Sequence, residues 1–180
     1  MEKTVSASKA GVTFGVYLGL ISIVFSLITY VAGIVGESYV SWISFLISIA
    51  FLCWAMMNFR DKQNGGVLEY KQGVGLGFVT FLVGGIISAI FTFILFKFID
   101  PGLVEQLVQK SLEEAVRKSP EIEGNLEMVE KWTRMLINPT AMAIMGVVAS
   151  AIGGIIISLI LAAIFKKEPS IFDGSQFEEA

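Results

Sequence analysis

Histidine is absent from the 180-residue chain, and cysteine occurs once, as Cys53. Without histidine the chain lacks the side chain that most often serves as a general base near neutral pH and as a metal ligand. A single cysteine cannot form an intramolecular disulfide, so cysteine usage does not reveal the redox compartment. We therefore expect no catalytic residue, no metal site and no cofactor, and we expect that the protein is not an enzyme.

Charged residues are also scarce, at 16% of the chain, whereas 54% is hydrophobic and the mean hydropathy is +0.74. The apolar residues form four charge-free blocks, each longer than the roughly 20 residues that cross a hydrocarbon core. We predict an all-α integral membrane protein with four transmembrane helices in a single membrane domain, 1–180. The predicted spans are about 10–35, 40–59, 73–98 and 139–165.

No acidic or basic residue lies deep in a predicted span. Proton relays, ion-coupled carriers and voltage sensors need such residues, so their absence counts against active transport. The polar residues that remain in the first three spans are mostly hydroxyls, which leaves a narrow uncharged pore or a lipid groove open. They include Ser22, Ser26, Thr29, Ser44, Ser48, Thr80, Ser88 and Thr92.

Basic residues outside the spans gather in three short segments that four spans would place on one side of the bilayer. By the positive-inside bias these segments face the cytoplasm. We therefore predict a multi-pass protein of the bacterial inner membrane with cytoplasmic N and C termini, an extracytoplasmic segment 100–136 and a cytoplasmic tail 168–180. The residues are Lys3, Lys9, Arg60, Lys62, Lys71, Lys166 and Lys167.

Segment 100–136 has the pattern of an amphipathic helical hairpin. Apolar residues recur at helical spacing after Asp100-Pro101 and stop at Ser119-Pro120, and a second, shorter helix follows before Asn138-Pro139, which has the pattern of a helix cap. Four of its glutamates precede Lys or Arg by four residues, which is typical of a solvated helix face rather than a cation site. The pairs are Glu113–Arg117, Glu114–Lys118, Glu127–Lys131 and Glu130–Arg134. We expect the hairpin to rest on its own bundle, with the lipid surface and a partner protein as alternatives.

Small residues four apart line one face of several spans, most clearly Gly146, Ser150, Gly154 and Ser158 in the fourth. In lipid, helices associate through close backbone approach, which such stripes permit. We interpret them as helix-packing surfaces inside one four-helix bundle, with self-association or a partner helix as alternatives. The other members are Gly11, Gly15 and Gly19 in the first span and Gly84 and Ser88 in the third.

Several stretches together resemble one protein family. These are the glycine-rich first span, "FRDKQNGGVLEYKQGVGLG" (59–77), "FIDPG" after the third span and the exit "IFKK" of the fourth. They are similar to the bacterial membrane family called domain of unknown function 4199. The resemblance implies a small inner-membrane protein, and it implies no activity and no site residues.

Our functional expectation is a non-enzymatic accessory or interaction subunit. Its expected partners are the lipid bilayer and either a membrane-protein partner or further copies of itself, with no nucleic acid. The alternative is a small transporter or channel for an uncharged substrate, formed by an oligomer.

Overall fold

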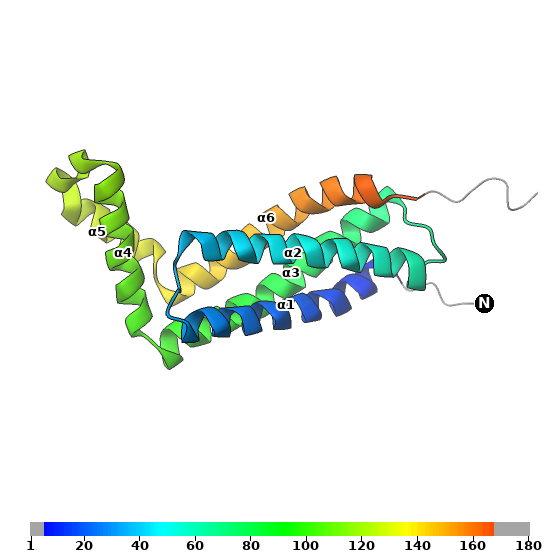
Figure 1. Ribbon diagram of the computed structural model, residues 1–180, viewed down its shortest axis with the longest axis horizontal. Helices are drawn as coiled ribbons and strands as arrows, with labels where there is room; N and C mark the ends of the chain where they lie inside the picture. Colours follow the sequence, from blue (N-terminus) through cyan, green and yellow to red (C-terminus); the bar gives the residue numbers. More distant parts are fainter. Residues whose placement is uncertain (1–5, 168–180) are drawn as a thin grey trace, which may run out of the picture.

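The computed structural model describes residues 6–167, and within that range the chain is helical apart from short connections (Figure 1). Extended pairing in this range is limited to one isolated bridge between Leu68 and Lys167. Lys3 and the predicted tail 168–180 lie outside the described residues. The elements are α1 (Ala7–Val31), α2 (Ser38–Asn58), the π-helical turn η1 (Phe59–Gln63), α3 (Tyr70–Ile94), the π-helical turn η2 (Leu95–Ile99), α4 (Gly102–Lys118), the 3₁₀ turn η3 (Pro120–Asn125), α5 (Leu126–Leu136) and α6 (Pro139–Phe165).

Four of these helices are long and apolar enough to cross a bilayer, which confirms the predicted number of spans. They are α1, α2 continued by η1, α3 continued by η2, and α6. All four run along the long axis of the molecule, with α4 and α5 together at one end, where α4 crosses that axis (Figure 1). The chain is therefore a multi-pass membrane protein.

The helix ends differ most from the predicted span limits at the C-terminal ends of the first two spans. α1 ends at Val31 because Gly33 and Gly36 adopt positive φ angles of 67° and 81°, which break the helix. α2 and α3 run on through η1 and η2, past the charges of Arg60 and Lys97, because backbone hydrogen bonding does not require apolar side chains. Polarity in the sequence therefore marks where the apolar blocks end rather than where the helices end.

The start of α6 agrees with the sequence pattern. Asn138 caps the helix, since its Oδ1 accepts a hydrogen bond from the Ala141 N–H at 2.9 Å, and Pro139 follows at the first helical position. The predicted Asn138-Pro139 cap is confirmed.

α3 is the central helix of the bundle. It packs along most of its length on α1 and on α6, whereas α2 contacts the other three helices much less. The buried residues of α2 are Leu52, Ala55 and Met56, all in its second half. These residues join a core that also contains Phe59 of η1 and Leu76 of α3. We call this the basic-end core, because it lies toward the end of the bundle where Lys9, Arg60, Lys71 and Lys166 occur.

α4 is attached to the opposite end of the bundle. Leu103 packs in a small core with Leu95 and Phe96 of η2. The Lys110 ammonium contacts the Glu37 carboxylate of the α1–α2 connection at 2.7 Å. The first half of α4 therefore rests on the ends of the spans.

Candidate functional site

The glycines of α1 form the contact surface with α3. A Cβ built on Gly11 would lie 2.9 Å from the Val79 Cβ, and one on Gly15 would lie 2.6 Å from the Val83 Cβ. Real Cβ atoms almost never come closer than 3.0 Å to another heavy atom. Gly19 meets α3 in the same way, against Ile87. Only glycine allows the two backbones to approach this closely.

Small residues of α6 face small residues of α3 in turn. A Cβ on Gly154 of α6 would meet the Phe81 Cβ at 2.5 Å, and the Ser158 hydroxyl donates to the Gly154 carbonyl. The small-residue pairs across this contact are Gly73 with Ala162, Gly77 with Ser158, and Gly85 with Ser150. The stripe of α6 thus contacts α3 from Ser150 onward.

Four of the predicted packing residues, Gly84, Ser88, Gly146 and Ser150, line a cavity. A Cβ added to Gly146 would meet no atom within 4 Å, and the same holds for Gly153, seven residues later on α6. Both glycines line the cavity, and so do Gly84 and Ser88 of α3, although a Cβ added to Gly84 would also lie 3.2 Å from Leu18 of α1. At Gly146 and Gly153, α6 therefore faces open space rather than a helix of this chain.

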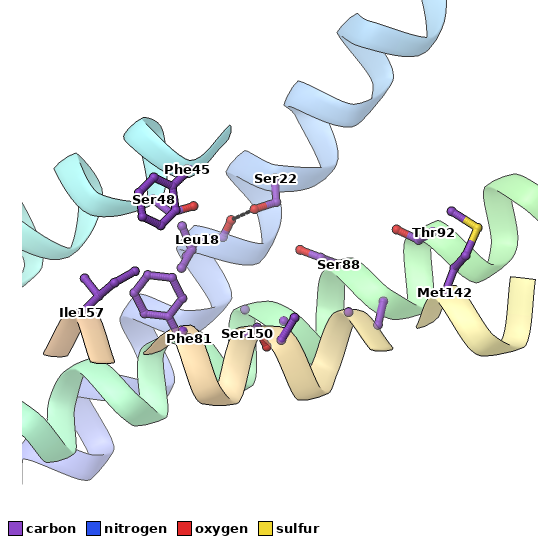
Figure 2. A pocket seen from close by; sticks show the side chains of 16 residues that line it. Leu18, Ser22, Phe45, Ser48, Phe81, Ser88, Thr92, Met142, Ser150 and Ile157 are labelled. Atoms are coloured by element: carbon purple, nitrogen blue, oxygen red, sulfur yellow. Dashed lines mark hydrogen bonds between the residues drawn. The ribbon is translucent and has the colours of Figure 1, made fainter. Parts of the chain in front are cut away.

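That space is a cleft of about 330 Å³ between α1, α2, α3 and α6. A second cavity of about 290 Å³, between α1, α2 and Ser88 of α3, shares Ser22, Ser48 and Ser88 with it, so the two are neighbours, and we call both together the cleft. Figure 2 shows side chains from all four helices around it, with hydroxyls at several positions. None of the residues that line either part is charged.

Some hydroxyls of the cleft are paired within their own helices. Ser22 donates to the Leu18 carbonyl at 2.9 Å, and Ser48 donates to the Ser44 carbonyl at 2.8 Å. Ser88 and Thr92, four residues apart on α3, have no hydrogen-bond partner among the described residues. The cleft therefore offers free hydrogen-bonding groups in an apolar surrounding.

The cleft is closed toward the basic end. Leu18, Phe81 and Ile157 line it and also belong to the basic-end core, in which Leu52 and Met56 are fully buried. No water-filled path is expected through such a core, because its side chains are packed without exposure. A single chain thus forms a blind cleft.

The lining of this cleft is uncharged, with hydroxyls among apolar side chains. It holds no titratable side chain, so it cannot provide general acid or base catalysis. Among the described side chains, which are those of residues 6–120 and 124–167, no three His, Cys, Asp or Glu come together in a way that could hold a metal ion. Hydroxyls and small apolar surfaces can bind a helix or another apolar molecule.

The sequence shows the hydroxyls of the cleft but does not group them into a site. Ser88 and Thr92 stand four apart, which places them on one helix face, and Gly146 belongs to the same stripe as Gly154. Nothing in the sequence shows that the first half of α2 stays away from the other spans and leaves these groups uncovered.

Several ion pairs lie outside the spans, within and between α4 and α5. Of the predicted glutamate pairs, Glu114 with Lys118 (3.5 Å) and Glu130 with Arg134 (2.8 Å) are confirmed. Arg134 also forms two hydrogen bonds to Glu105 of α4, at 2.7 and 2.8 Å, which no local pattern predicts. The hydrogen bonds from Arg134 and then from Gln109 lower the pKa of Glu105 to about 2.

Comparison with known proteins gives one match. The sequence model of a family described as "Protein of unknown function (DUF4199)" matches residues 13–167. No curated protein matches the chain, and no solved structure matches it.

Proposed function

Because the chain belongs to the DUF4199 family, whose description states no activity, we propose a function from the cleft instead. In this proposal the protein is a non-enzymatic accessory subunit, and its cleft binds a transmembrane helix of a partner membrane protein. Within this proposal the protein lies in the inner membrane with both termini in the cytoplasm. The α4–α5 segment then forms an extracytoplasmic helical hairpin.

The observation that carries the proposal is the pair of uncovered glycines in α6. A glycine in a helix is less favourable than alanine by about 1 kcal/mol unless something needs the missing side chain. Gly15 and Gly154 have such a reason in their contacts with α3, whereas Gly146 and Gly153 face the cleft, where an added Cβ would meet nothing in this chain. Close approach of a second backbone would supply the reason, as in small-residue contacts between membrane helices.

The free hydroxyls of Ser88 and Thr92 support the same occupant. A hydroxyl at membrane depth without a partner is unfavourable, because lipid tails offer no acceptor. Helices in membranes use Ser and Thr side chains to bond across their contacts. A partner helix that carries hydroxyl or amide groups would satisfy both side chains.

A passive channel within one chain has less support, because the basic-end core seals the cleft. A pore would have to form between copies, and lipid-facing small residues would have to line it. The blind shape of the cleft favours an occupant that stays over one that passes through.

The test is site-specific photo-cross-linking in native membranes. A photoreactive residue replaces Ala149, which lines the cleft, and in a matched control it replaces Ile160, a lipid-exposed residue of the same helix. Mass spectrometry of the purified adducts identifies the peptide attached and its stoichiometry. We expect the Ala149 position to give one adduct, mapped to a transmembrane helix of another protein and lost in Gly153→Leu, which fills the cleft.

Other results would contradict the proposal in distinguishable ways. Adducts only with this same chain would make the cleft a contact between copies. Adducts only with lipid, or the same adducts from Ala149 and Ile160, would show that the cleft selects no helix.

A further inference from the structure

α5 carries an apolar face that no described residue covers. Trp132, Met135 and Leu136 follow Met128 by four, seven and eight residues, which places all four on one side of a helix. Met128, Trp132, Met135 and Leu136 are 62%, 60%, 64% and 50% exposed. The helix is strongly two-sided, because its other residues include two glutamates, a lysine and Arg134.

The orientation of this face is fixed by contacts with α4. Arg134 bonds to Glu105 across the two helices at 2.7 Å, and the half-buried α5 residues, Val129, Glu130 and Thr133, lie away from the centre of the apolar face. The packing of α5 on α4 thus uses a different side of the helix and leaves the apolar face outward.

The far end of α5 is tied directly to a membrane span. The Asn138 side chain accepts from the Ala141 N–H of α6 at 2.9 Å and donates through Nδ2 to the Met135 carbonyl of α5 at 2.8 Å. Leu136, the last residue of α5, is three residues before Pro139, so the two lie within about 11 Å of each other. The C-terminal end of α5 therefore lies at the level where α6 enters the bilayer.

The end of α3 marks the same level independently. The Lys97 ammonium lies over the Phe93 ring at 4.9 Å and over the Phe98 ring at 5.6 Å. A lysine there extends along apolar surface toward the headgroups, so it marks the boundary of the hydrocarbon. Phe98 and Ile99 beyond it remain exposed, which continues the apolar surface of the spans to this boundary.

We propose that α5 is an interfacial helix that lies in the headgroup region of the bilayer, with Met128, Trp132, Met135 and Leu136 turned into the lipid. A helix with one charged and one apolar side, low net hydrophobicity and a tryptophan is typical of this location. The occupant of the face is lipid because the face ends next to a span, at the level where the exposed apolar surface of the spans also ends. This inference does not depend on what fills the cleft.

The first experiment measures the depth of Trp132 by fluorescence quenching. The full-length protein carries Trp42→Phe and Trp54→Phe, so that Trp132 is the only tryptophan, and is reconstituted in phosphatidylcholine vesicles. Lipids brominated near the headgroup or near the chain end serve as quenchers. The reference keeps only Trp54, which lies within the second span and is lipid-exposed.

We expect shallow bromines to quench Trp132 more than deep ones, and iodide in the aqueous phase to quench it weakly. Strong quenching by iodide with none by bromine would place the face in water. Protection from both would mean that protein covers it, in this preparation a second copy. Either result would overturn the proposal.

A second measurement covers the case in which the tryptophan variants fail to fold. A nitroxide is attached at Met135→Cys in a Cys53→Ser chain, with Glu130→Cys on the opposite side of α5 as the matched control. We expect the Met135 position to be more accessible to oxygen and the Glu130 position to a water-soluble nickel complex. Equal accessibilities at both positions would refute an interfacial location.

Discussion

Gly15→Ala is the substitution for which the structure gives the clearest expected cost. The added Cβ would lie 2.6 Å from the Val83 Cβ and 2.9 Å from the Thr80 carbonyl oxygen. An ordinary contact begins at 3.4 Å, so α1 and α3 must separate by about 0.8 Å at this point. The Thr80 carbonyl is part of the backbone, and the Val83 Cβ is bonded directly to the Val83 Cα. Neither atom can therefore move away by a change of side-chain rotamer.

The size of the effect follows from the contacts that the separation weakens. A gap of 0.5–1 Å removes about a quarter to a half of the dispersion energy of each atom pair along the contact. Inserting one methyl group into a well-packed contact costs about 1–3 kcal/mol. We expect the free energy of unfolding of the purified monomer to fall by that amount.

The assay is reversible unfolding of the purified protein in mixed micelles, followed by circular dichroism. The matched control is Gly146→Ala, whose Cβ meets no atom within 4 Å and which we expect to leave the monomer as stable or slightly more stable. Equal effects of the two substitutions would refute the reasoning that the α1 glycines serve packing on α3.

Two further predictions concern the α4–α5 segment. Arg134 lowers the pKa of Glu105 from 4.5 to about 2, so their contact stabilises the segment above pH 4.5 and is lost as the pH falls from there toward 2. Amide hydrogen exchange of α5, corrected for intrinsic rates, should therefore accelerate in that pH range. In Glu105→Gln the corrected exchange should stay independent of pH. Acceleration starting above neutral pH would contradict this assignment. Asn138→Ala should lower the free energy of unfolding by about 0.5–2 kcal/mol and speed amide hydrogen exchange at 133–142. Asn138→Asp should be intermediate because it keeps only the hydrogen-bond acceptor. Unchanged exchange would show that the bonds to Met135 and Ala141 do not hold α5 to α6.

The number of spans and the amphipathic pattern of 100–136 can be predicted from the sequence because both depend on local composition. Asn138-Pro139 can be identified as a cap for the same reason, since capping involves neighbouring residues. The contact of Arg134 with Glu105 joins residues 29 positions apart, and no periodicity encodes it.

The cleft could not be predicted, because it depends on where α2 fails to pack. The stripe of α6 has the pattern of one surface from Gly146 to Ser158, yet Gly154 contacts Phe81 while Gly146 faces open space. The difference arises from the distance between helices, which small residues permit and do not determine.

The central position of α3 also bears on how the protein is made. α1 and α2 leave the ribosome first, and they contact each other only slightly. The contacts of α3 with α1 and with α6 are both far more extensive. The first pair therefore has little to hold it together in the membrane until the third helix is inserted. We expect a chain truncated after α2 to be inserted but unassembled and open to membrane proteases, and protection to begin once synthesis has passed Ile99.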